Sequence, residues 1–141
     1  MILLDTNVLS ELARAVPDPA VLAWADAVPV AHFCTTAITE AEVRFGVELL
    51  PPGRRRERLE LALDAVFRGV IAGRVLPFDR AAALVYGRLA AQRRRLGRGV
   101  DIPDLQIAAI AVARGVDAIV TRNHRDFEGC GVSLVDPWIG N

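Results

Sequence analysis

The chain has 141 residues, of which 52% are hydrophobic and 24% charged, a composition typical of a globular protein with a buried core. Its 17 basic and 17 acidic residues cancel, which argues against a simple basic clamp for nucleic acid. Every basic residue is arginine, whose forked guanidinium suits phosphate, although genomic base composition is an alternative explanation for a lysine-free chain.

The length suits a single domain spanning residues 1–141, without internal repeats or low-complexity tracts. The longest purely apolar run, residues 107–113, is too short for a transmembrane helix, and the N-terminus lacks the basic region of a signal peptide. We therefore expect a cytoplasmic protein that does not contact a membrane. Cys34 and Cys130 are expected to stay reduced, because cysteines outside the secretory pathway seldom pair.

The first predicted element is a short buried strand at residues 2–4, which ends at Asp5. Thr6 and Asn7 favour a helix start, and an apolar helical pattern follows them. Ligands of open α/β sheets bind at the carboxyl ends of the strands, so Asp5 is a candidate site residue. The alternative interpretation is that Asp5 only caps the helix.

A short helix is expected to begin at Asp18 and to end at Pro29. Residues 30–35 then predict a strand, in which we interpret His32 as a structural residue rather than a ligand.

The helix predicted over residues 38–50 carries a second candidate. At about 100° per residue, Glu42 shares one stripe with apolar residues and is expected to point toward the core. The apolar members of this stripe are Ile38, Ala41, Phe45 and Leu49. Glu40 is expected to face solvent and to pair with Arg44 at i,i+4. A charge aimed at the core needs a charged partner, a hydrogen bond or a metal ion. The alternative role for Glu42 is a capping box, in which Thr39 and Glu42 bond to the start of the helix.

Two basic segments follow. Residues 54–72 predict a packing helix, whose arginines at 54, 55, 56 and 58 we interpret as a solvated face rather than an RNA patch. A strand at 75–78 leads to a long helix that Asp79 caps and that ends at Leu96. The arginines at 93, 94, 95 and 98 around its end either contact phosphate or compensate the helix dipole.

The third acid, Asp104, opens a helix at 105–114 that is apolar around nearly its whole circumference and should be buried. Asp101 is expected to serve the loop or cap rather than the site. A strand at 118–121 ends just before Asn123, and a final strand is expected at 132–135.

This alternation of strands and helices predicts a three-layer α/β/α sandwich with a mainly parallel sheet. In such a fold Asp5, Glu42, Asp104 and Asn123 can converge. Two carboxylates about 4 Å apart repel by roughly 4 kcal/mol at an effective dielectric of 20, so the cluster would share protons or bind cations. Oxygen ligands without neighbouring cysteine or paired histidine favour Mg²⁺ or Mn²⁺ over Zn²⁺.

Four segments together resemble the PIN-domain ribonucleases. These are Leu-Leu-Asp5-Thr-Asn7, Ile-Thr-x-Ala-Glu42-Val-x-x-Gly46, Asp104-x-x-Ile-Ala-Ala109 and Thr121-Arg-Asn123-x-x-Asp126-Phe127. Their order and spacing are similar to those of the VapC type of bacterial toxin, particularly its FitB-like branch, and the likeness spans nearly the whole chain.

The resemblance implies a Mg²⁺- or Mn²⁺-dependent endoribonuclease, usually homodimeric, that a cognate VapB-like antitoxin holds inactive. Asp5, Glu42 and Asp104 match the three metal-site acids of the family. Many relatives have Asp where this chain has Asn123, and we place Asn123 in the site as the fourth residue, with Asp126 as the second choice. By the same analogy Thr6 and Thr121 orient a water, a carboxylate or a phosphate.

Two other enzyme classes and a non-enzymatic module are alternatives to this family. Haloacid-dehalogenase phosphatases also begin with a hydrophobic strand and Asp, but their second Asp is Asn7 here and the chain has no lysine for their usual lysine position. A PIN-like module that binds RNA or protein without cleavage is favoured by Asn123, and a DNA-directed nuclease is a further alternative. The sequence does not name the RNA target.

Overall fold

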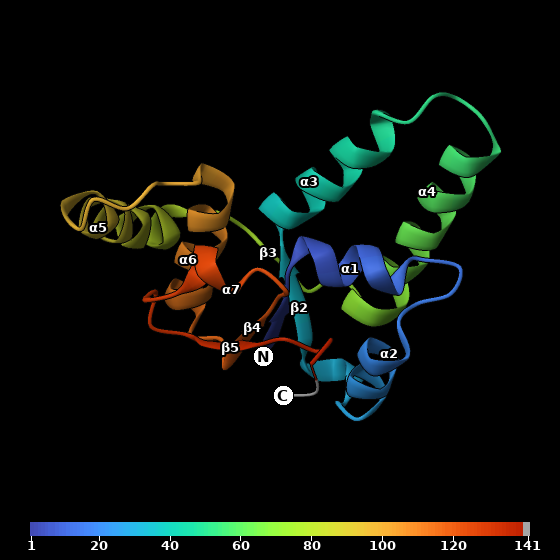
Figure 1. Ribbon diagram of the computed structural model, residues 1–141, viewed down its shortest axis with the longest axis horizontal. Coiled ribbons are helices and arrows are strands. Elements are labelled where there is room, and N and C mark those ends of the chain that lie inside the picture. Colours follow the sequence, from blue (N-terminus) through green and yellow to red (C-terminus); the bar gives the residue numbers. More distant parts are fainter. Residues whose placement is uncertain (140–141) are drawn as a thin grey trace.

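A five-stranded sheet forms the centre of the computed structural model, which describes residues 1–139 (Figure 1). All strands run parallel in the order β3-β2-β1-β4-β5. They are β1 (Ile2–Leu4), β2 (Phe33–Thr36), β3 (Val75–Leu76), β4 (Ala118–Val120) and β5 (Ser133–Val135). The predicted parallel α/β/α sandwich is confirmed.

Helices cover both faces of the sheet (Figure 1). One layer holds α1 (Thr6–Leu12), α2 (Pro19–Asp26), α3 (Ala37–Glu48) and α4 (Arg54–Val66), which continues into the π-helical turn η2 (Phe67–Ile71). The other layer holds α5 (Arg80–Arg95), α6 (Ile102–Arg114) and the short α7 (His124–Phe127). None of the described helices is long and apolar enough to cross a membrane.

The alternation of β1 divides the core into two parts. Leu3 points to the layer of α5 and α6 and packs with Ile107 and Ile110 of α6, all fully buried. Leu4 points to the opposite layer and packs with Val8 of α1. Burying one such side chain contributes about 1.5–3 kcal/mol, so the central strand holds both layers together. As predicted, α6 is buried around most of its circumference.

The register of the two central strands positions the first acid. Leu4 of β1 lies beside Val120 of β4, and the Asp5 N–H donates to the Val120 carbonyl at 3.0 Å. The residues that follow each strand, Asp5 and Thr121, therefore meet at the carboxyl edge of the sheet.

Two predicted strands are shorter than expected. Residues 30–32 form a 3₁₀ turn (η1, Val30–His32), because Pro29 starts the turn and its carbonyl accepts the His32 N–H at 2.9 Å. The prediction that His32 lies within a strand was wrong, and its side chain is exposed. The strand expected at 75–78 has two residues.

Cys34 and Cys130 are both buried and each is a free thiol. Burial raises the pKa of the Cys34 thiol to about 11. A thiol with this pKa stays protonated at neutral pH and is a poor nucleophile.

Candidate active site

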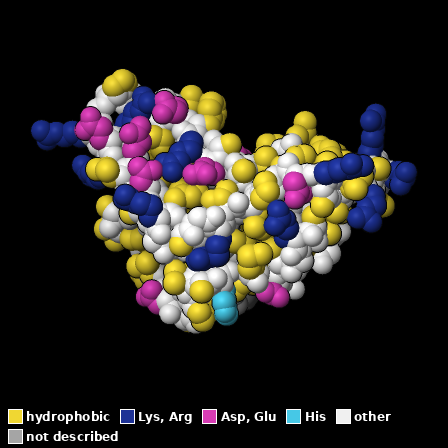
Figure 2. Space-filling model, turned by 180° about the vertical axis from the view of Figure 1, so that it is seen from behind, with side chains coloured by type: hydrophobic (Ala, Val, Ile, Leu, Met, Phe, Trp, Pro, Cys, Tyr) yellow, Lys and Arg dark blue, Asp and Glu magenta, His cyan; other side chains and the backbone are white. Residues whose placement is uncertain are grey.

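The candidate residues come from four elements that meet at the carboxyl edge of the sheet (Figure 1). Asp5 follows β1, Glu42 lies in the middle of α3, Asp104 lies in the first turn of α6, and Asn123 follows β4. Seen from behind, the surface is hollowed between the lobe of α3 and α4 and the lobe of α5 and α6 (Figure 2).

Asp5 is the most deeply placed acid, with 4% of its surface exposed. Its Oδ2 accepts a hydrogen bond of 2.8 Å from the Thr121 hydroxyl, and its Oδ1 is buried without a partner among residues 1–139. Burial raises the pKa of Asp5, and the hydroxyl of Thr121 opposes that rise. The side chain makes no capping bond to α1, so the capping alternative is wrong and one buried oxygen remains available for a ligand.

Glu42 lies beside Asp5 and is partly exposed. The Thr6 hydroxyl donates to Glu42 Oε1 at 3.0 Å, so the residue after Asp5 orients the second carboxylate. Partial burial raises the pKa of Glu42, and the nearby charges of Asp5 and Asp101 raise it further.

The predicted core-facing stripe of α3 was wrong in direction. Phe45 and Leu49 are 64% and 68% exposed, whereas the buried residues are Thr39, Val43 and Val47. The buried face is therefore rotated by about one residue, roughly 100°, from the stripe that contains Glu42. Glu42 lies outside this buried face, and its Oε1 accepts a hydrogen bond from Thr6 at the start of α1.

Neither Glu40 nor Glu42 caps the start of α3. The N-cap is Thr36, whose hydroxyl accepts the Thr39 N–H at 3.0 Å, so the proposed capping box between Thr39 and Glu42 is absent. Glu40 pairs with Arg44 at 3.3 Å, as predicted for the opposite face of the helix. The two glutamates of α3 are thus separated into one that faces the other acids and one that does not.

Asp104 carries the largest shift in the cluster. Burial, the carboxylate of Asp126 and the charges of Asp101 and Asp5 raise the pKa of Asp104 to about 8. Asp101 caps α6, since its Oδ1 accepts the Asp104 N–H at 3.1 Å, as predicted. Like-charged carboxyls in one site resist ionisation unless a cation neutralises them.

Asn123 and Asp126 act as one unit. The Asn123 amide Nδ2 donates to Asp126 Oδ2, and its backbone N–H donates to the Thr121 hydroxyl at 3.0 Å. Asp126 influences the pKa of Asp104 directly. The structure thus brings Asn123, the predicted fourth residue, and Asp126, the second choice, together beside Asp104.

The sequence analysis missed Asn7 as a site residue. Its Nδ2 donates to the Thr121 hydroxyl at 3.3 Å, and its Oδ1 accepts the Arg122 N–H at 3.2 Å. Thr121, fully buried, thereby connects the residues after β1 to those after β4. The available signal was the position of Asn7 in the segment Leu-Leu-Asp5-Thr-Asn7, to which the sequence assigned no role beyond the helix start.

The basic turn after α5 adjoins the acids. Arg93 and Arg98 line a hollow of about 530 Å³ that also touches Asp101 and Asp126. Arg93 donates to the Asp126 carbonyl at 2.7 Å, and Arg98 lies 3.6 Å from Glu128. These two arginines therefore anchor α7, a role that neither of the two predicted alternatives included.

The donor set fits a hard divalent cation. Among residues 1–139, no three Asp, Glu, His or Cys side chains lie close enough together to hold a metal ion by themselves. Mg²⁺ keeps several waters and takes only one or two protein carboxylates directly, so an open set of oxygen donors suits it. A bound cation would give the buried Oδ1 of Asp5 a partner. Its positive charge would also lower the raised pKa of Asp104.

The sequence profile of the PIN domain matches residues 2–129, from β1 through α7. The chain belongs to the PIN-domain family. The matched range includes Asp5, Glu42, Asp104 and Asp126, and it confirms the resemblance found in the four sequence segments.

Full-length relatives place the chain beside the VapC and FitB members of the PIN-domain family. It is 45% identical over 138 residues to the VapC ribonuclease Y4jK of Sinorhizobium fredii, covering 98% of each chain. It is 36% identical over 138 residues to the toxin FitB of Neisseria gonorrhoeae, covering 98% of this chain and 99% of FitB. The crystal structure of FitAcB from N. gonorrhoeae superposes with a TM-score of 0.87 at 36% identity, covering 98% of this chain and 99% of that one.

Proposed function

We propose that the protein is a metal-dependent endoribonuclease and the toxin of a VapBC-type toxin–antitoxin system. The observation that carries this proposal is the group of carboxylates from separate elements, with one buried oxygen unpartnered and one pKa raised to about 8. The relative from S. fredii is named a VapC ribonuclease, which supports RNA as the substrate class.

Asp5, Glu42 and Asp104 would hold Mg²⁺, with Mn²⁺ as an alternative ion, and Asp126 is the candidate fourth acid. When bound, the ion would lower the pKa of an attacking water and stabilise the charge that develops on the phosphate and the leaving oxygen.

The chain's own residues fix the acids and supply no nucleophile. Thr121 holds the Asp5 carboxylate and Thr6 holds the Glu42 carboxylate, at 2.8 and 3.0 Å. Positioning of this kind lowers the entropic cost of bringing the reactants together. Water attacks phosphorus, the bond to the 3′ oxygen breaks, and the products carry a 5′-phosphate and a 3′-hydroxyl.

The expected partners are RNA, a VapB-like antitoxin and a second copy of the chain. The similar solved structures include FitAcB and a DNA-bound VapBC from Salmonella typhimurium, which supports control by a partner protein. We expect the protein to act in the cytoplasm.

Single-turnover cleavage tests the proposal. Antitoxin-free protein is incubated with a panel of structured RNAs and matched single-stranded DNAs in Mg²⁺, Mn²⁺ or chelator, beside Asp5→Asn purified in the same way. We expect cleavage of RNA that requires metal and is lost in the variant. Cleavage that survives the chelator or the substitution would contradict the proposal, and preferential cutting of DNA would change the substrate class.

A second candidate function is a module that binds RNA or protein without cleaving. The exposed Asn123 favours it, because an amide brings no negative charge to the acid cluster. Calorimetric titration with Mg²⁺ and Mn²⁺ separates the two, because a disabled site would bind neither ion and would show no difference between the wild type and Asp5→Asn.

A further inference from the structure

A hollow of about 600 Å³ lies between α1 and α4, and Asn7 is one of the residues that line it. Its charged lining is mostly arginine: Arg14, Arg55, Arg58 and Arg122. We propose that this hollow binds phosphates of the RNA strand that runs from the cleavage site, with Arg55 and Arg58 as its principal phosphate contacts. The inference rests on the proposed ribonuclease function and adds the path of the substrate.

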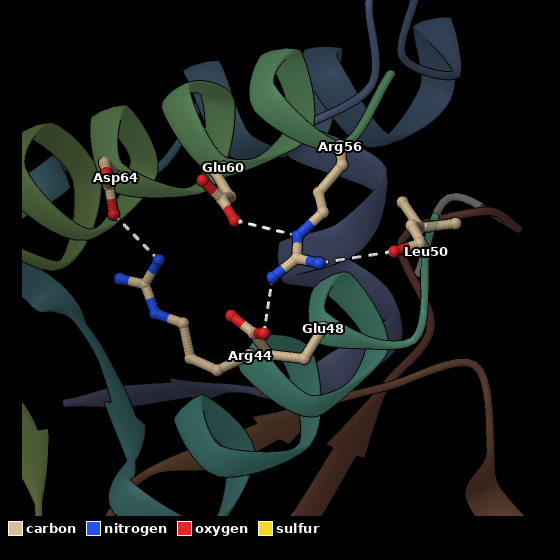
Figure 3. A network of polar contacts seen from close by, with 6 residues as sticks. All are labelled: Arg44, Glu48, Leu50, Arg56, Glu60 and Asp64. Carbon is tan, nitrogen blue, oxygen red and sulfur yellow. Dashed lines mark hydrogen bonds and ion pairs between the residues drawn. The ribbon is translucent and has the colours of Figure 1, made fainter. Parts of the chain in front are cut away.

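The arginines at the start of α4 divide by what they contact. Arg56 is held by Glu60 at 3.3 Å and by Glu48 at 2.5 Å, and it also donates to the Leu50 carbonyl, which joins α4 to α3 (Figure 3). Among residues 1–139, no carboxylate lies within 4 Å of the Arg55 or Arg58 guanidinium. Arg54, Arg55 and Arg58 are exposed, as expected for a solvated face, and Arg56 is partly buried by its partners.

A second ion pair joins α3 and α4 one turn further along α4. Arg44 of α3 pairs with Asp64 of α4 at 2.7 Å and completes the α3–α4 contact (Figure 3). Four carboxylates of the two helices are thus directed toward Arg44 and Arg56: Glu40, Glu48, Glu60 and Asp64. Arg55 and Arg58 face the hollow with their charge uncompensated, which is a favourable starting state for an anionic ligand.

Arg122 extends this charge toward the acids. Its guanidinium stacks on the Trp138 ring, 3.9 Å from the ring centroid, and no carboxylate among the described residues pairs with it. Stacking uses the face of the guanidinium and leaves its N–H edge available for phosphate. The Arg122 backbone N–H is fixed by Asn7, whose amide reaches Thr121 and, through it, Asp5. The hollow and the acid cluster therefore share one hydrogen-bonded wall.

The charge of the hollow favours a polyanion. Its one acid, Glu11, is 7% exposed and is occupied by the Asp18 N–H at 3.0 Å and by Arg14 at 3.3 Å. Arg55, Arg58 and Arg122 are left as a net charge of about +3. The volume lies within the usual range of about 300–1,000 Å³ for ligand pockets, which is sufficient for a nucleotide.

Salt-dependent RNA binding tests the proposal on the protein in chelator, where cleavage is not required. The probe is a labelled single-stranded RNA of about a dozen nucleotides. The test variant is Arg55→Ala/Arg58→Ala. The control is Arg54→Ala/Arg68→Ala, which removes two exposed arginines outside the hollow. Loss of two phosphate contacts should reduce the slope of log K against log salt by about 1.4, since each contact on a single strand contributes about 0.7.

The control should keep the slope of the wild type, and Arg55→Lys/Arg58→Lys should keep most of it. Equal slopes for the test and control variants would overturn the proposal. A test variant that binds RNA normally and loses only the binding of a partner protein would also overturn it. If the wild type cleaves RNA and the test variant retains its full slope, only this inference fails. If the wild type neither binds nor cleaves RNA, the proposed function fails with it.

Discussion

Replacement of Asp104 by asparagine should stabilise the metal-free protein in a pH-dependent way. The pKa of Asp104 is about 8 in the folded protein against an ordinary 3.8, because burial and the acids around it disfavour its charge. The folded state therefore holds this proton more tightly than the unfolded state does. The stabilisation that the Asp104 proton contributes is complete below pH 4, decreases as the pH rises toward 8, and changes little above that value.

The slope of this loss has an upper limit of about 1.4 kcal/mol per pH unit. Asp104 is only half-buried, so solvent screening reduces the effect, and we take about a third of the limit. The stability of Asp104→Asn relative to wild type should then increase by about 1 kcal/mol between pH 5 and pH 7. For a chain of this length this is about 3 °C in melting temperature.

Thermal unfolding in chelator at several pH values measures this difference. Asp26→Asn, an exposed substitution on α2, is the control and should follow the wild type throughout. A difference between Asp104→Asn and wild type that is the same at pH 5 and pH 7 would refute the argument, because it would show that Asp104 ionises as freely as a surface acid.

The other predictions concern the metal and the reaction. Glu42→Gln should reduce cleavage more than about 100-fold, which is the upper end of the effect of losing a residue that supports a metal ligand. Glu40→Gln should stay close to wild type, because Glu40 pairs with Arg44. Equal losses in the two variants would overturn the assigned face of α3. Thr121→Val should weaken Mg²⁺ binding about 10- to 100-fold by calorimetry, since Asp5 loses its hydrogen bond, and unchanged affinity would contradict this role. Mg²⁺ affinity should rise about twofold per pH unit up to about pH 8, the same third of the one-proton limit, because binding displaces the Asp104 proton, and a flat profile would exclude that coupling.

The sheet and the location of the site were predictable because they depend on local patterns. A short apolar run that stops at an acid indicates a buried strand end, and parallel strands bring such ends to one edge. Asp5 and Thr121 meet for this reason, since the pairing of β1 with β4 aligns the last residue of each strand. The start of α6 was equally clear, from Asp101 and the proline after it.

The orientation of α3 was not predictable from its apolar residues. The helical stripe assumed that Phe45 and Leu49 are buried, but both are exposed and Val43 and Val47 pack against the core. Which side of a helix is covered depends on the crossing angle with its neighbours. The inward direction of Glu42 was therefore inferred from a wrong premise, although the structure does place it near the other acids.

Side chains that act across elements were also beyond the sequence. Asn7 reaches Thr121 across more than a hundred residues of chain, a contact that only the β1–β4 pairing creates. Similarly, four arginines at the start of α4 look alike in the sequence. Only the packing of α3 determines that Arg56 is held by carboxylates while Arg55 and Arg58 are not.

The chemistry of the cleaved ends tests the central claim most directly. RNA is cut in Mg²⁺ in water enriched in ¹⁸O, and the products are analysed by mass spectrometry. Hydrolysis at the acid cluster predicts a 5′-phosphate that carries one ¹⁸O atom and a 3′-hydroxyl on the other fragment. Products ending in a 2′,3′-cyclic phosphate and a 5′-hydroxyl would show attack by the ribose 2′-hydroxyl, and the account of this site would be wrong.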